Sequence, residues 1–214
     1  MIVDERLVTY INSLDRGNTE ILDIIEKEAL DTYVPIIRKE MQSFLKLLLA
    51  MQKPMRILEV GTAVGFSAIL MAEYGPKNCE IVTIENYDKR IPIAKENFIR
   101  ANKEEQITLL EGDASIVLPT IEEPFDMIFM DAAKGQYINF MPEVFRLLKV
   151  GGVLVSDNVL QDGDIIESHF VVERRNRTIY KRMREDLYEL THNDNLVTSV
   201  MPIGDGITVS TKIS

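Results

Sequence analysis

Residues 56–67 read Arg-Ile-Leu-Glu-Val-Gly-Thr-Ala-Val-Gly-Phe-Ser and decide the fold. The mostly apolar run from Arg56 to Gly61 predicts a short buried strand. Helical periodicity then begins at Gly65 and continues to Tyr74. A buried strand that leads through a glycine-containing turn into a helix is typical of a β-α-β unit, so this stretch indicates a parallel sheet.

The same alternation continues through the middle of the chain. Further buried strands are predicted at 80–85, 107–112, 125–131 and 152–157, and helices at 88–102, 114–118 and 136–148. The order strand, helix, strand predicts right-handed crossovers between parallel strands.

The two ends of the chain differ from this middle part. Residues 4–51 are mainly helical and have no strand partner, so we expect these helices to cap the sheet or to mediate dimerisation. At the other end, 196–203 and 207–213 predict two strands separated only by Gly204-Asp205-Gly206, which is hairpin chemistry. The sheet is therefore expected to end in an antiparallel pair.

The composition is that of a folded protein. With 214 residues, 46% of them hydrophobic, the chain suits one α/β domain over residues 1–214. A net charge of −10 disfavours a surface that binds nucleic acid or anionic lipid everywhere, and leaves only a local basic patch for this. No apolar stretch is long enough to span a bilayer, and the amino terminus carries Asp4 and Glu5 rather than the basic residues of a secretory signal. Cys79 is the only cysteine, so we expect a cytoplasmic protein without an internal disulfide.

The turn after the first strand is a candidate nucleoside site. Its glycines let the backbone approach a ligand, although a tight turn without a ligand would use the same residues. Ala63 stands in place of the middle glycine of the dinucleotide fingerprint, which disfavours a pyrophosphate. Glu85 ends the second strand, where an acid can accept both hydroxyls of a ribose, and Asp113 and Ala114 follow the third strand at the same sheet edge. These positions predict a nucleoside that lacks a pyrophosphate.

A second polar group follows the fourth and fifth strands. Because neighbouring parallel strands end at one edge, Asp131, Asp157 and Asn158 would present oxygen atoms to one point. Oxygen ligands suit Mg²⁺, Mn²⁺ or Ca²⁺, whereas an ordinary turn and a helix cap are the alternative for these residues. Lys134 would lie beside the cation, which favours a neutral amine that can act as a general base. Its alternative is a solvated charge at a helix start.

Together these motifs resemble the cation-dependent O-methyltransferases of the catechol and caffeoyl-coenzyme A type, from about Tyr33 to Ile213. The resemblance implies S-adenosylmethionine as cofactor and a Rossmann-like seven-stranded sheet with an antiparallel last strand. It also implies the cofactor contacts: Glu85 at the ribose, Asp113 and Ala114 near the adenine, and Ile37, Gly61 and Ser67 around the methionine end, with Asp131 beside them.

The implied chemistry is consistent with these residues. A sulfonium carries its own leaving group, so the enzyme must mainly align a nucleophilic oxygen and remove its proton. A cation that chelates two adjacent substrate oxygens would fix the geometry and lower the pKa of the hydroxyl, and Lys134 would take the proton.

A basic segment is the third feature. Residues 174–184 carry six positive charges and no acidic residue: Arg174, Arg175, Arg177, Lys181, Arg182 and Arg184. As a helix, the segment would carry most of its cations on one stripe and pack its opposite face, with Ile179, Met183 and Leu187. A solvated helix face is one interpretation, and a grip on phosphates at the mouth of the site is the other.

Five short motifs also resemble a bacterial branch of this family, the tRNA 5-hydroxyuridine methyltransferases, which make 5-methoxyuridine at the wobble position. They lie at 34–36, 61–63, 131–137, 157–160 and 202–206. The branch implies tRNA as the partner, because the 5-hydroxyl and 4-oxygen of the base form a chelating pair like that of a catechol. A small-molecule catechol-type enzyme and a non-catalytic nucleoside-binding module are the alternatives. We also expect a homodimer, and His169 and His192 at the surface.

Overall fold

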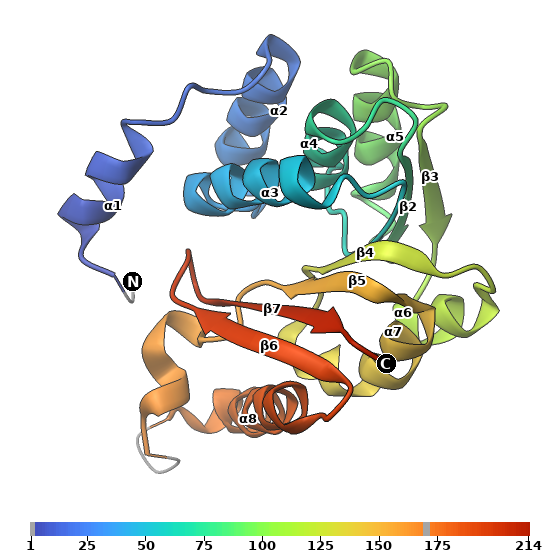
Figure 1. The fold of residues 1–214 in the computed structure, drawn as a ribbon. Coiled ribbons are helices and arrows are strands. Elements are labelled where there is room, and N and C mark those ends of the chain that lie inside the picture. The colour runs from blue at the N-terminus through green and yellow to red at the C-terminus, as the bar shows by residue number, and fades with distance from the viewer. Residues whose placement is uncertain (1–2, 169–171) are drawn as a thin grey trace.

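The computed structural model describes residues 3–168 and 172–214, which form a seven-stranded sheet with helices on both faces (Figure 1). The strand order is β3-β2-β1-β4-β5-β7-β6. The strands are β1 (Arg56–Val60), β2 (Glu80–Glu85), β3 (Ile107–Glu111), β4 (Phe125–Met130), β5 (Leu148–Ser156), β6 (Leu196–Met201) and β7 (Ile207–Lys212). Strands β1 to β5 pair in parallel, and β7 runs antiparallel to both β5 and β6. The predicted α/β sheet with an antiparallel C-terminal pair is confirmed.

One face of the sheet is covered by the helices of the first half of the chain. These are α2 (Glu20–Asp31), α3 (Lys39–Gln52), α4 (Phe66–Tyr74) and α5 (Ile91–Arg100), and α1 (Glu5–Asn12) precedes them. Helix α4 is buried from Phe66 to Ala72 because it lies between the sheet and the neighbouring helices. The apolar core on this face includes Leu22, Leu45 and Ile69.

The opposite face is covered by α6 (Ala114–Val117), α7 (Tyr137–Leu147) and α8 (Arg177–His192). Short 3-10 turns connect the elements: η1 (Leu118–Thr120), η2 (Lys134–Gln136), η3 (Gln161–Ile166) and η4 (Arg174–Asn176). The second apolar core, which includes Phe125, Tyr137 and Met183, lies on this face.

Several predicted boundaries differ from the structure, and two of them need a structural explanation. Strand β5 begins at Leu148 rather than at Gly152, because Leu148 already pairs with Phe125 of β4. The register then shifts before Met127 pairs with Val153, and a glycine pair lies within this irregular part of β5. Gly151 has a φ of 81°, which few other residues adopt. The basic segment is also not one helix: Arg174 lies in η4, where the Asn176 N–H donates to the Glu173 carbonyl at 2.8 Å, and α8 begins only at Arg177.

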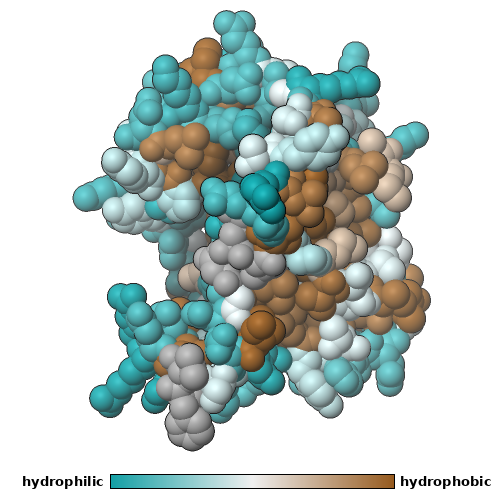
Figure 2. Space-filling view, turned by 90° about the vertical axis from the view of Figure 1, so that its left-hand side faces the viewer, coloured by the Kyte–Doolittle hydropathy of each residue, from teal (hydrophilic) through white to brown (hydrophobic). Residues whose placement is uncertain are grey.

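The amino-terminal helices do not all cap the sheet. Helices α2 and α3 pack on α4, whereas α1 has no buried residue and lies apart from the sheet (Figure 1). The apolar side chains of α1 and the turn after it, at Leu7, Tyr10, Ile11 and Leu14, are about half exposed or more. Figure 2 views the molecule from the side of α1 and shows apolar patches on this face among hydrophilic side chains.

Two further predictions concern single features. His192 is exposed at the end of α8 and stacks on Tyr188, whereas His169 lies outside the described residues. Across residues 3–168 and 172–214, we find no helix with the length and apolar character needed to cross a membrane.

Candidate active site

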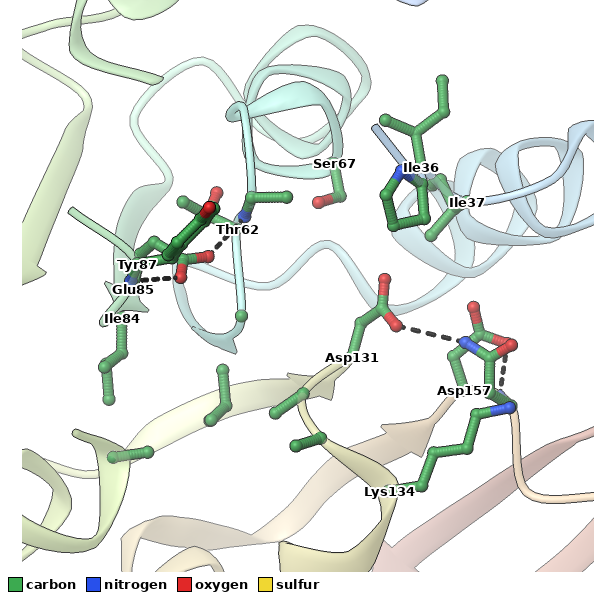
Figure 3. A pocket seen from close by; sticks show the side chains of 18 of the residues that line it. Ile36, Ile37, Thr62, Ser67, Ile84, Glu85, Tyr87, Asp131, Lys134 and Asp157 are labelled. Atoms are coloured by element: carbon green, nitrogen blue, oxygen red, sulfur yellow. Dashed lines mark hydrogen bonds between the residues drawn. The ribbon is translucent and has the colours of Figure 1, made fainter. Parts of the chain in front are cut away.

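A cavity of about 720 Å³ lies at the carboxyl ends of the parallel strands. Both predicted groups of polar residues line it. Figure 3 shows Glu85 and Tyr87 at one end and Asp131, Asp157 and Lys134 at the other, with Thr62 and Ser67 between them. The structure therefore brings the candidate nucleoside site and the candidate cation site into one cavity.

The turn after β1 requires its first glycine. Gly61 has a φ of 94°, and a Cβ atom there would lie 2.4 Å from the carbonyl oxygen of Asp131. The Gly61 N–H donates to the carbonyl of Ile84 at 2.9 Å. The absence of a side chain thus lets the ends of β1, β2 and β4 approach each other, which closes the floor of the cavity.

Glu85 is held in place by three backbone N–H groups. One carboxylate oxygen accepts from Ala63 at 2.8 Å, and the other accepts from Asn86 at 3.0 Å and Tyr87 at 2.8 Å. These bonds tie the predicted ribose ligand to the turn after β1. A carboxylate offers about four lone-pair sites, so one remains free to accept a hydroxyl, on the oxygen that accepts from Ala63.

Asp113 and Ala114 line the cavity beside Glu85. The Asp113 carboxylate caps α6 by accepting from the Ser115 N–H at 2.8 Å and the Ser115 hydroxyl at 2.6 Å. These hydrogen bonds lower the pKa of Asp113, so the group is fixed as an anion at the cavity wall.

The predicted residues of the methionine end also line the cavity. Ile37 and Ser67 are both buried there, beside Gly61. Behind them lies Glu59, a fully buried acid in β1 that is not among the predicted site residues. Burial raises the pKa of Glu59 to about 7, and nearby hydroxyls, including that of Thr83 at 2.5 Å, partly oppose this rise. An acid inside an otherwise apolar strand is the sequence signal that points to it.

The three predicted cation ligands meet at the ends of β4 and β5. The Asn158 side-chain amide donates to Asp131 Oδ1 at 3.2 Å, and the Asp157 N–H donates to the Met130 carbonyl at 2.9 Å. Burial raises the pKa of both carboxyls, the negative charge of Asp131 raises that of Asp157 further, and the positive charge of Lys134 lowers both. Two buried neighbouring carboxylates repel each other, so this donor set fits a bound divalent cation.

The donor set is mixed rather than all-carboxylate. In the part of the chain that the structure describes, no three His, Cys, Asp or Glu side chains gather in a way that suits a metal ion. The candidate site instead combines two carboxylates with one amide, and its fit to Mg²⁺, Mn²⁺ or Ca²⁺ rests on oxygen donors alone.

Lys134 lies at the start of η2, and its side chain extends toward Asp157 (Figure 3). Its turn is held from α8, because Arg182 donates to the carbonyl of Gly135 at 2.8 Å. The element that carries the basic segment therefore also supports the predicted base.

The predicted cations of the basic segment have different environments. Three are engaged in hydrogen bonds to backbone carbonyls: Arg177 with Val172, Arg182 with Gly135 and Arg184 with Ile165. Arg175 pairs with Glu173 at 2.6 Å, and Lys181 lies 3.7 Å from Glu185. Arg174 is exposed. At least half of the set thus stabilises the local fold.

The inner face of α8 agrees with the sequence only in part. Met183 is buried as predicted, but Ile179 is more than a third exposed. Tyr180 and Asp186 are buried instead, and neither was expected there.

One further pair at the cavity was not predicted. Arg38, before α3, and Asp205, in the turn between β6 and β7, form an ion pair at 2.8 Å and line the cavity near the cation ligands. The negative charge of Asp205 contributes to the raised pKa of Asp157. Residues so distant in sequence give no local signal of their contact.

Comparisons with known proteins identify relatives of the chain. A catechol O-methyltransferase of Niastella koreensis is 38% identical to this chain over 130 residues, which are 59% of each protein. The match to a catechol O-methyltransferase of Mycobacterium tuberculosis spans 56% of the length of that protein. Caffeoyl-CoA O-methyltransferase 2 of Populus trichocarpa is 29% identical over 79% of this chain and 72% of its own. The SAH-bound methyltransferase PaMTH1 of Podospora anserina superposes with a TM-score of 0.87 at 25% identity, covering 99% of this chain and 97% of that one. The O-methyltransferase family matches residues 12–213, and the chain belongs to this family.

Proposed function

We propose that this chain transfers a methyl group from S-adenosylmethionine to one of two adjacent substrate oxygens, and that it requires a divalent cation. The observation that carries this proposal is the placement of Asp131, Asp157 and Lys134 at one end of a cavity whose other end holds Glu85. A nucleoside-containing cofactor that spans the cavity would bring its reactive end to the cation site. A module that only binds a nucleoside would not require Lys134 at this end of the cavity.

The proposed cofactor contacts are supported by the cavity, because all of the residues concerned line it. Glu85, fixed by backbone N–H groups, would accept a ribose hydroxyl. Asp113 and Ala114 would lie at the adenine, and Ile37, Gly61 and Ser67 at the methionine end. The SAH-bound relative supports this choice of cofactor class.

The chemical step uses few side chains. Asp131, Asp157 and Asn158 would hold the cation, which when bound orients two substrate oxygens and favours ionisation of one of them. Lys134 would accept the proton of the reacting hydroxyl. S-adenosylmethionine, when bound, would supply the methyl group together with a neutral thioether leaving group, so the residues of this chain need only align the oxygen and remove its proton.

The cation requirement is tested by methyl transfer to a catechol with and without chelator. We expect activity to disappear in excess chelator and to return with Mg²⁺ or Mn²⁺. Asp157→Ala should abolish turnover while cofactor affinity persists, and Asp194→Ala, which removes an exposed carboxylate, is the matched control. Full turnover in excess chelator would exclude the proposed cation.

A catechol-type small molecule is the first substrate candidate. The names of the relatives favour it, and the site needs only two adjacent oxygens. The 5-hydroxyuridine of tRNA is the second candidate, and one observation favours it: the basic segment contacts the turn that carries Lys134, through Arg182. Phosphates bound at the exposed cations would therefore lie near the proposed base.

Parallel assays with a catechol and with tRNA that contains 5-hydroxyuridine separate the two candidates. The paired change Arg174→Glu and Lys181→Glu reverses two exposed cations and spares the arginines that bind backbone carbonyls. If tRNA is the substrate, its methylation should fall steeply and the salt dependence of binding should weaken by nearly one log-log unit per lost phosphate contact. Unchanged tRNA methylation would leave the small molecule as the substrate class.

We further propose that the chain forms a homodimer through α1. The exposed side chains of Leu7, Ile11 and Leu14 recur at helical spacing, and an apolar stripe of this kind is normally covered. Light scattering should give twice the mass of 24.4 kDa for the wild type, and Leu7→Glu with Ile11→Glu should give the monomer mass. A wild-type monomer would contradict this assembly.

A further inference from the structure

Tyr137 belongs to the motif at 131–137 but has no part in the chemistry described above. It is the first residue of α7 and is completely buried. Its hydroxyl lies 3.1 Å from the carbonyl oxygen of Met130 and 3.1 Å from that of Asp157. Met130 ends β4 and directly precedes the proposed ligand Asp131. Asp157 directly follows β5 and is itself a proposed ligand.

Of the two carbonyls, that of Asp157 depends more on the Tyr137 hydroxyl for a hydrogen bond. The Met130 carbonyl already accepts the Asp157 N–H at 2.9 Å. For the Asp157 carbonyl, the residues that the structure describes offer no other donor than the Tyr137 hydroxyl. Asp157 is only 5% exposed, so its carbonyl depends on a protein donor.

That carbonyl belongs to the peptide group that joins two ligands. The Asp157 carbonyl and the Asn158 N–H lie in one plane, because the peptide bond is planar. The N–H end donates to Asp157 Oδ1 at 2.7 Å, and the carbonyl end meets Tyr137. Asn158 follows with a φ of 61°, a left-handed conformation that asparagine adopts more readily than most residues other than glycine. The plane of the Asp157–Asn158 peptide group is thus fixed at both ends by hydrogen bonds. This plane in turn sets the directions of the Asp157 and Asn158 side chains.

We infer that Tyr137 is a positioning residue for the cation site: its hydroxyl holds the Asp157–Asn158 peptide group so that the ligand side chains converge with Asp131. The inference rests on the proposed function, because it assigns Tyr137 a duty toward the cation. Tyr137 does not touch the cation or the substrate in this role. It acts through the main chain of the ligands.

Tyr137→Phe removes one oxygen atom and keeps the ring that fills the core. We expect Mn²⁺ affinity, measured by calorimetry without substrate, to fall about 10- to 100-fold, the usual effect of losing a group that orients metal ligands. The Mn²⁺ concentration for half-maximal methyl transfer should rise by the same factor, and kcat at saturating Mn²⁺ should stay near that of the wild type. The affinity for S-adenosylhomocysteine should not change.

Tyr180→Phe is the matched control. Tyr180 is also buried, and its hydroxyl donates to a backbone carbonyl, that of Glu167, at 2.9 Å. Its loss should leave Mn²⁺ affinity unchanged. Equal loss of Mn²⁺ affinity in both variants would overturn the inference, because any buried tyrosine hydroxyl would then have the effect.

The remaining outcomes are equally decisive. Wild-type Mn²⁺ affinity in Tyr137→Phe would overturn the inference and leave the proposed function intact. A parallel fall in S-adenosylhomocysteine affinity, or failure of the variant to fold, would show that Tyr137 supports the whole fold and would also overturn it. Absence of Mn²⁺ binding by the wild type would instead refute the cation requirement itself, and the inference with it.

Discussion

Asp186 is a buried acid whose cost to the fold can be measured. It lies on the inner face of α8, 1% exposed, and neither carboxylate oxygen has a hydrogen-bond partner among residues 3–168 and 172–214. Burial raises the pKa of Asp186 to about 7. An Asp in the unfolded chain titrates near 3.9, so the folded state binds more protons than the unfolded state between about pH 4 and pH 7. The stability contributed by this position therefore falls as the pH rises through that window, and it is constant above it.

The magnitude follows from the two pKa values. A rise from about 3.9 to about 7 corresponds to roughly 4 kcal/mol of unfavourable free energy once the carboxyl is charged in both states. Near pH 5 the folded carboxyl is still protonated, and the penalty is only about 1.5 kcal/mol. Asp186→Asn stays neutral, so its free energy of unfolding relative to the wild type should increase by roughly 3 kcal/mol between about pH 5 and pH 8. The buried amide carries its own desolvation cost, but this cost does not vary with pH.

Urea unfolding at several pH values measures this difference. Glu189→Gln makes the same chemical change at an exposed position of α8 and should give a curve parallel to that of the wild type. The free energy of unfolding of Asp186→Asn could instead run parallel to that of the wild type between pH 5 and pH 8. Asp186 would then be ionised or solvated in the folded protein, which would refute the burial penalty.

Three further substitutions test the site. Lys134→Ala should lower kcat by about 10² to 10⁴ and be partly rescued at higher pH, where the substrate hydroxyl ionises unaided; a loss confined to KM would make Lys134 a substrate anchor instead. Arg182→Ala removes the bond to Gly135 and should lower kcat roughly 10- to 100-fold through displacement of the Lys134 turn, whereas wild-type turnover would show that the turn holds itself. Gly61→Ala places a Cβ atom 2.4 Å from a backbone oxygen and should destabilise the fold by at least about 1–3 kcal/mol in urea unfolding; a neutral result would contradict the close approach of β1 and β4.

The predictable part of this molecule is the part with local signals. The parallel strands were predictable from short apolar runs between helical segments. Because parallel strands end at one edge of a sheet, the proximity of Glu85, Asp131 and Asp157 in one cavity was predictable too. Both follow from side-chain periodicity within a few residues of each position. The antiparallel end of the sheet was predictable because Gly204-Asp205-Gly206 lies between two strand-like runs, although β6 already ends at Met201 and the connection to β7 is longer than predicted.

The missed features depend on contacts between distant segments. Arg182 meets Gly135 from another element, and Arg38 meets Asp205 from opposite ends of the chain. Helical spacing placed Met183 inside but gave no reason to bury Asp186, because an acid on a cationic helix is expected in solvent. Tertiary packing decided these positions, and no local pattern encodes it.

Helix α8 links the proposed substrate surface to the placement of the proposed base. Its exposed cations, such as Lys181, are the surface that a phosphate backbone would contact, and the next residue, Arg182, holds the turn of Lys134. A substrate bound on the outer face would therefore contact the same helix that holds the turn of the proposed base. Changes at Lys181 should then alter KM for tRNA alone, whereas changes at Arg182 should alter kcat for tRNA and catechol alike, because only the second contact lies between the helix and the reaction. If both changes acted on KM alone, α8 would be a binding surface without influence on Lys134.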